Sequence, residues 1–132
     1  MLVVHDSLFI ALGAAIGANL RYWFGYWLVG KEHPGFPWHT LIVNVSGSLA
    51  LVAIMALAFA KGWGHGWRLF AAVGICGGYT TFSTFSAEIV RLFEEREFQQ
   101  ALTYAIGSNV LSILGCPAGA HFARMAVTSL HG

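Results

Sequence analysis

Polar side chains lie within long apolar stretches of this chain, where a bilayer makes them costly and where they often contact an ion or a substrate. They are Arg21, Asn44, Ser83, Thr84, Glu88, Tyr104, Ser108 and Ser112. Measured inward from one common face at about 1.5 Å per residue, Arg21 lies at roughly 13 Å, Asn44 at roughly 9 Å and Ser108 at roughly 10 Å. Ser112 lies deeper, at roughly 16 Å. This convergence predicts a polar vestibule that narrows toward the middle of the membrane.

Each of these residues also has a structural interpretation. Arg21 can extend to the interface along its aliphatic stem, or it can pair with Glu88. Asn44 can make a hydrogen bond between helices. The hydroxyl groups of four residues can instead bond to carbonyls of their own helix turn: Ser83, Thr84, Ser108 and Ser112. Because Ser108 and Ser112 share one helix face with Tyr104, we favour a row of hydroxyls that replaces water around an ion.

The segment between Gly77 and Ser86 reads GGYTTFSTFS and is poor helix material. Two glycines followed by two β-branched threonines lower helix propensity at this point. A break would free backbone carbonyls at mid-membrane, where transporters use such carbonyls to bind ions. The alternative is a continuous helix in which the glycines serve close packing.

The elements that must position these groups are four apolar runs. They are Ser7–Gly30, Trp38–Ala60, Trp67–Phe93 and Ala101–Ala123. Only 10% of the residues are charged, against about 25% in soluble domains, and about 20 apolar residues cross a bilayer. We therefore expect an all-α integral membrane protein, a single transmembrane domain over residues 1–132. The net charge of +1 argues against a nucleic acid partner.

The basic residues outside the spans are evenly divided between the two faces. Face A, formed by the N-terminus, the second connection and the C-terminus, carries Lys61, Arg68 and Arg124. Face B, formed by the first and third connections, carries Lys31, Arg91 and Arg96. Orientation normally follows a Lys and Arg excess on the cytoplasmic side, and none exists here. Either another cue sets orientation, or, as we favour, the chain inserts both ways and pairs with an inverted copy.

Three segments resemble the Fluc/CrcB fluoride channels, and the match runs through all four spans. They are GGYTTFSTFSAE (Gly77–Glu88), GAAIGANLRYW (Gly13–Trp23) and WHTLIVNVSGS (Trp38–Ser48). Tyr104, Ser108 and Ser112 are similar to the polar track on that family's fourth helix. TTFSTFS carries most of the specificity.

The resemblance implies an antiparallel, dual-topology homodimer with two pores and a third helix broken at mid-membrane. It implies a structural Na⁺ on the dimer axis, held by the backbone carbonyls of Gly77 and Thr80. It also assigns the family's pore phenylalanines to Phe82 and Phe85, whose positive ring edges can face an anion. Periodicity alone would make these two rings core packing.

The function we expect is passive, fluoride-selective export of cytoplasmic F⁻ through a prokaryotic plasma (inner) membrane, which lowers fluoride toxicity. It requires no covalent chemistry and therefore no enzyme activity. One rival is a small multidrug-type transporter, also a four-helix dual-topology dimer, but that class needs an embedded carboxylate. The first run has no acid, and Glu88 lies near a span end. The other rival, a non-conducting scaffold, leaves the polar groups at one depth unexplained.

Overall fold

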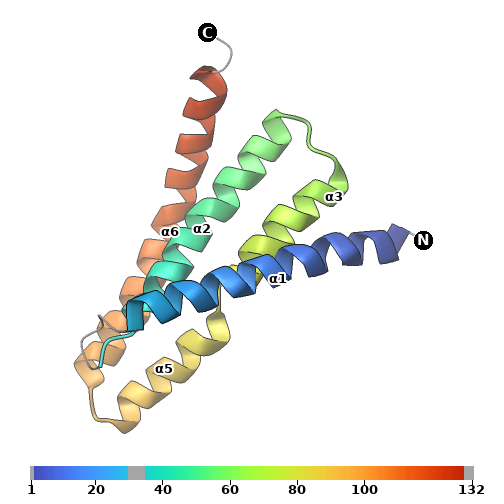
Figure 1. The fold of residues 1–132 in the computed structure, drawn as a ribbon. Helices are drawn as coiled ribbons and strands as arrows, with labels where there is room; N and C mark the ends of the chain where they lie inside the picture. Colours follow the sequence, from blue (N-terminus) through green and yellow to red (C-terminus); the bar gives the residue numbers. More distant parts are fainter. Residues whose placement is uncertain (1, 30–34, 130–132) are drawn as a thin grey trace.

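The computed structural model describes residues 2–29 and 35–129, and every regular element in these two ranges is a helix. In chain order they are α1 (Leu2–Val29), α2 (Trp38–Ala60), α3 (His65–Arg68), the π-helix η1 (Leu69–Cys76), α4 (Gly77–Tyr79), α5 (Phe82–Glu94) and α6 (Phe98–Ser129). Helices α2 and α6 lie side by side, and α1 crosses η1 and α4 (Figure 1).

Three of these helices are long and apolar enough to cross a membrane. Their spanning stretches are Val3–Leu28, Trp38–Ala60 and Phe98–Ser129. The first and last helices extend beyond the expected ranges, beginning at Leu2 rather than Ser7 and ending at Ser129 rather than Ala123. At the C-terminal end, Arg124, Met125 and Ala126 have good helix propensity and continue α6 past the expected range. The second span has the expected bounds.

The third expected span, residues 67–93, is two half-helices rather than one helix. Thr80 (φ −79°, ψ 157°) and Thr81 (φ −150°, ψ 113°) are extended. The break therefore lies just after the glycines, because Gly77 and Gly78 remain helical in α4. The half-helix formed by α3, η1 and α4 is about 22 Å long and α5 is about 20 Å long. A break within GGYTTFSTFS was expected, and the structure places it at the two threonines of this segment while the two glycines stay helical.

Glycines bring α1 close against the first half-helix. A Cβ atom on Gly13 would collide with the carbonyl oxygen of Phe70, and one on Gly17 would collide with that of Ile75. Gly119 of α6 approaches the Leu49 carbonyl of α2 in the same way. These glycines therefore allow helices to pack backbone against backbone.

The connections at the two faces are fixed by local hydrogen bonds. At face A, Gly62 has φ +63° and the Trp63 N–H donates to the Ala58 carbonyl at 2.9 Å, which ends α2 in a Schellman motif. At face B, Arg96 takes the equivalent left-handed position with φ +62°. Glu97 N–H donates to the Leu92 carbonyl at 2.9 Å there.

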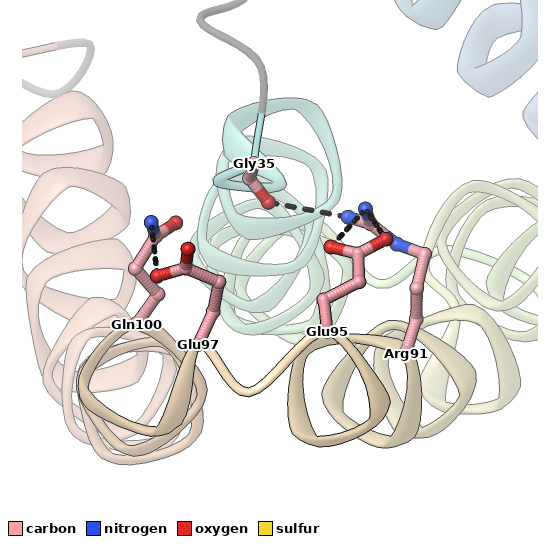
Figure 2. A network of polar contacts seen from close by, with 5 residues as sticks. All are labelled: Gly35, Arg91, Glu95, Glu97 and Gln100. Carbon is pink, nitrogen blue, oxygen red and sulfur yellow. Dashed lines mark hydrogen bonds and ion pairs between the residues drawn. The ribbon is translucent and has the colours of Figure 1, made fainter.

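Polar contacts also join segments distant in sequence at each face. At face B, Arg91 Nη2 donates to the Gly35 carbonyl at 3.2 Å, and Arg91 Nη1 donates to Glu95 Oε1 at 3.1 Å (Figure 2). At face A, His65 Nε2 lies 3.5 Å from Asp6 Oδ2, which joins the start of α1 to the second connection. The chain thus crosses between the two faces as the four-run pattern predicts.

Candidate functional site

A cavity of about 310 Å³ lies beside the helix break. Among the residues that line it are Asn44 of α2, Phe82 and Phe85 of α5, Ser108 and Ser112 of α6, and Gly77 and Thr80 at the break. Sequence analysis assigned all seven either to an anion pathway or to a metal site. The structure brings these seven residues together from three parts of the chain.

The break is held open by Asn44. The Thr81 N–H donates to Asn44 Oδ1 at 2.8 Å, and Asn44 Nδ2 donates to the Thr81 carbonyl at 3.0 Å. Thr81 in turn caps α5, because its Oγ1 accepts from the Thr84 N–H at 3.2 Å. Backbone groups that a helix would have paired are thus paired by side chains, which makes the extended residues tolerable inside a membrane.

Ser108 presents an unusual hydroxyl to this cavity. Its side chain is 4% exposed, and its Oγ has no hydrogen-bond partner among residues 2–29 and 35–129. Bonding to the carbonyl one turn earlier, the structural interpretation of this serine, is therefore wrong here. A buried hydroxyl without a partner costs roughly 1–3 kcal/mol, so the site favours a ligand or water that accepts from it.

The two phenylalanines differ sharply in their surroundings. The Phe85 ring is 7% exposed and packs against the Tyr104 ring at a centroid distance of 5.1 Å. The Phe82 ring is 76% exposed and lies 5.6 Å from the Phe85 ring, tilted by 43°. Core packing therefore describes Phe85 but not Phe82, which projects from this chain next to the cavity.

Glu88 is held by two hydroxyl groups and not by Arg21. Thr40 Oγ1 donates to Glu88 Oε1 at 2.9 Å, and Tyr104 Oη donates to Glu88 Oε2 at 2.6 Å. The Tyr104 side chain is fully buried and lies behind Phe85 rather than in the cavity lining. Tyr104 thus links the carboxylate to the wall of aromatic rings.

Arg21 and Thr84 line a second, larger cavity of about 790 Å³, together with His39 and Thr81. Arg21 Nη1 donates to the Thr80 carbonyl at 3.3 Å. The guanidinium group therefore lies at the helix break. Both structural interpretations of Arg21 are therefore wrong, because its side chain contacts the break rather than extending to the interface or pairing with Glu88.

Ser83 lies apart from both cavity linings. Its side chain is exposed, and its Oγ is 3.2 Å from Thr81 Oγ1. Among the predicted pathway residues, it and Tyr104 are the two that the structure does not place on a cavity wall.

The carbonyls at the break are chemically suited to a hard cation. The Thr81 N–H, which would pair with the Gly77 carbonyl in a continuous helix, is bonded to Asn44 instead. A Cβ atom on Gly77 would meet nothing within 4 Å, so this part of the backbone faces open space. Carbonyl oxygens are ligands that hard cations prefer. The Thr80 carbonyl also accepts from Arg21, so a cation at Thr80 would share this oxygen with the guanidinium group.

Three residues of the site were not singled out from the sequence: His39, Thr40 and Thr81. Thr40 precedes Asn44 by one helix turn, so it shares a face with the predicted pathway residue. This spacing could have identified Thr40 as a candidate site residue from the sequence. Nothing in the sequence indicates that Thr81 is the partner of Asn44, because their contact joins two different helical segments.

Comparison with known proteins places this sequence in a family. A family model described as "CrcB-like protein, Camphor Resistance (CrcB)" matches residues 8–120. The chain belongs to the CrcB family. Two CrcB relatives named fluoride-specific ion channel FluC are similar over most of their length. The protein from Nitrobacter winogradskyi is 47% identical over 122 residues, which cover 88% of this chain and 93% of the relative. The protein from Sphingopyxis alaskensis is 44% identical over 116 residues, which cover 86% of this chain and 92% of the relative.

A third relative of the same name, from Thermus thermophilus, is 44% identical over 111 residues, which cover 84% of this chain and 87% of the relative. The relatives are bacterial, and this CrcB chain has three apolar helices able to span a bilayer. It is a multi-pass protein of a prokaryotic plasma membrane.

Proposed function

We propose that this chain is a fluoride-selective channel that passively exports cytoplasmic F⁻ and so reduces fluoride toxicity. The similarity to proteins named fluoride-specific ion channels supports this assignment, and it also supports a channel rather than an enzyme. The observation in the molecule that carries the proposal is the buried hydroxyl of Ser108, which lines the smaller cavity and has no hydrogen-bond partner among the described residues.

The cavity offers what a small, tightly hydrated anion needs. Hydroxyl groups of Ser108 and Ser112 and the amide of Asn44 donate hydrogen bonds in place of water. The edges of the Phe82 and Phe85 rings add weak positive potential. Conduction requires that the ion enter and also leave, and neutral donors with ring edges hold an anion less tightly than a fixed charge would.

The conducting unit in this proposal is an antiparallel, dual-topology homodimer with two pores. Phe82 supports it, since an aromatic ring that is 76% exposed beside a polar cavity is well placed to form a pore wall with a second copy. The equal number of basic residues on faces A and B supports the inverted arrangement. Lys31, one of the face B residues, lies outside the described ranges.

A structural Na⁺ on the dimer axis is the second element of the proposal. The carbonyls of Gly77 and Thr80 would hold it, and a second copy would supply the same two groups again. The ion would join the two breaks and would share the Thr80 carbonyl oxygen with Arg21. A crystal structure of the dimer in NaCl tests this. Density between four carbonyls is expected, and an axis without density would contradict the metal site.

The channel function itself is tested with purified protein in liposomes loaded with KF. On addition of valinomycin, we expect F⁻ efflux at a fluoride electrode far above that of protein-free liposomes. Efflux equal to that of protein-free liposomes, from protein that elutes as a monodisperse species before reconstitution, would contradict the proposed function. The multidrug-type alternative predicts instead a proton-coupled flux of organic cations.

A further inference from the structure

Asn109 of α6 is a further residue on the wall of the smaller cavity. It follows Ser108 directly and precedes Ser112 on the same helix, and all three residues line the same hollow. The Asn109 side chain is exposed, whereas that of Ser108 is buried. The exposed Phe82 ring lines the cavity as well. Asn109 and Phe82 therefore lie at the rim of the cavity, and Ser108 lies deeper.

The depth of Asn109 in the membrane makes its carboxamide costly. Asn109 lies roughly 16 Å along α6 from Phe98, close to the middle of a hydrocarbon core about 30 Å thick. Its neighbours one helix turn away, Ile106 and Ile113, are exposed and apolar. Lipid chains neither donate nor accept hydrogen bonds. The amide is therefore stabilised by its own helix, by water or an ion in the cavity, or by a second protein group.

One hydrogen bond of this carboxamide lies within its own helix. Asn109 Nδ2 donates to the Ala105 carbonyl at 2.7 Å. A carbonyl can only accept, so the NH₂ group must be the one that faces it. An asparagine side chain has two N–H donors. Within residues 2–29 and 35–129 the second N–H has no partner, so it is able to donate to a ligand in the cavity.

Asn19 of α1 has the same local structure without the cavity. Its side chain is exposed, and its Nδ2 donates to the Ala15 carbonyl at 2.8 Å. It lies roughly 15 Å from the end of α1 at Val29, which is nearly the depth of Asn109. Asn19 lines neither of the two cavities of the site. The two asparagines therefore match in exposure, local hydrogen bond and depth, and they differ in contact with the cavity.

We propose that Asn109 is a further residue of the fluoride pathway, and that its second N–H donates to the anion at the rim of the smaller cavity. The inference rests on the proposed function. A neutral donor suits this position because it replaces one water molecule of a tightly hydrated anion without a fixed charge that would retain the ion. Asn109 and the deeper hydroxyl of Ser108 then form successive weak sites along one wall.

The surroundings of Asn109 are tested without any flux, by the reactivity of a thiol in its place. Asn109→Cys and Asn19→Cys are made in a chain whose Cys76 and Cys116 are alanine, and both proteins are reconstituted in liposomes. Methyl methanethiosulfonate is small and uncharged, and it reacts with the thiolate, which apolar surroundings suppress. The thiol at position 109 should react at least about tenfold faster by intact mass, since one unit of pKa changes the thiolate fraction tenfold. Equal rates at the two positions would overturn the proposal.

Flux then shows whether the amide serves the anion. Asn109→Ala should lower F⁻ efflux per folded protein by about fivefold, as expected for the loss of one neutral donor, and Asn19→Ala should stay within about twofold of wild type. Asn109→Gln, which keeps a carboxamide, should retain more efflux than Asn109→Ala.

Two results of the flux experiment would overturn the proposal. One is equal efflux from Asn109→Ala and Asn19→Ala. The other is a smaller assembly of Asn109→Ala on size exclusion, which would assign the amide to a contact between copies. Absence of F⁻ efflux from wild-type protein would refute the proposed function instead, and the thiol reactivity would still show whether position 109 contacts water.

Discussion

The side-chain amide of Asn44 makes two hydrogen bonds with the backbone of Thr81, accepting from its N–H at 2.8 Å and donating to its carbonyl at 3.0 Å. One α2 side chain thereby satisfies both backbone groups of an extended residue inside the membrane. The same asparagine lines the smaller cavity, where its remaining amide proton is available. Asn44 therefore couples the shape of the pore to the stability of the break.

Asn44→Ala should reduce both F⁻ flux and stability. It removes both partners of Thr81, and each unsatisfied buried backbone group costs roughly 1–3 kcal/mol. We expect a lower apparent melting temperature in detergent and a large loss of efflux per folded protein. Asn19→Ala is the matched control, because the one hydrogen bond of the Asn19 side chain within residues 2–29 and 35–129 goes to the carbonyl of Ala15 in its own helix. Equal behaviour of the two variants would show that the amide has no special role.

Ser108→Ala should separate function from stability. The substitution removes a buried hydroxyl that has no partner in the described part of the chain, so stability should stay equal or rise by up to about 1 kcal/mol. Flux should fall, because the cavity loses a donor for the anion. Ser7→Ala, at an exposed site where the hydroxyl bonds to the Val3 carbonyl, serves as the control. A stable Ser108→Ala protein with wild-type flux would remove Ser108 from the pathway.

Gly17→Ala should destabilise the helix bundle, whereas Gly107→Ala should not. A Cβ atom on Gly17 collides with the Ile75 carbonyl, and the rigid backbone there has to shift at a cost of about 1–3 kcal/mol. A Cβ atom on Gly107 meets nothing within 4 Å, and alanine there gains up to about 1 kcal/mol in helix propensity. Thermal unfolding of both proteins in detergent measures the difference. A change of the same sign and size in both would contradict backbone packing at Gly17.

Inverted subunits predict labelling from both sides of the membrane. Single cysteines replace Gly64 at face A or Gln99 at face B, in a chain whose Cys76 and Cys116 are changed to alanine. Both positions are exposed and uncharged, so the balance of basic residues is preserved. An impermeant maleimide applied to sealed vesicles should label about half of each variant, because no Lys and Arg excess selects one orientation. Complete protection of one position with complete labelling of the other would establish a single orientation.

Much of the helical arrangement follows from local sequence patterns. The apolar run Trp38–Ala60 coincides with α2, since hydrophobicity and helix propensity change at the same residues. Gly13 and Gly17 are four residues apart, a local pattern typical of close helix packing, and both lie against the backbone of η1. The convergence of Asn44, Phe85 and Ser108 on one cavity could be estimated from depth along each helix, because that calculation needs only the rise per residue.

What could not be predicted depends on contacts between distant residues. The break was expected somewhere within the two glycines and two threonines of this segment, but the sequence did not show that Gly77 stays helical or that Asn44 of another helix bonds to the backbone of Thr81. The sequence also left open whether Arg21 pairs with Glu88. In the folded chain Arg21 donates instead to the Thr80 carbonyl. Glu88 accepts from the hydroxyl groups of Thr40 and Tyr104. Such choices depend on how α1 crosses the bundle, which no local pattern in α1 specifies.

The most direct test of the channel is the flux of F⁻ against that of Cl⁻ through the same reconstituted protein. F⁻ efflux should exceed Cl⁻ efflux by at least about tenfold, since a narrow pore excludes the larger ion and meets its hydration demand poorly. Phe82→Ile and Phe85→Ile should each impair F⁻ flux, because isoleucine fills space but lacks a ring edge of positive potential. Equal flux of F⁻ and Cl⁻ through folded wild-type protein would contradict the assignment of this chain as a fluoride-selective channel.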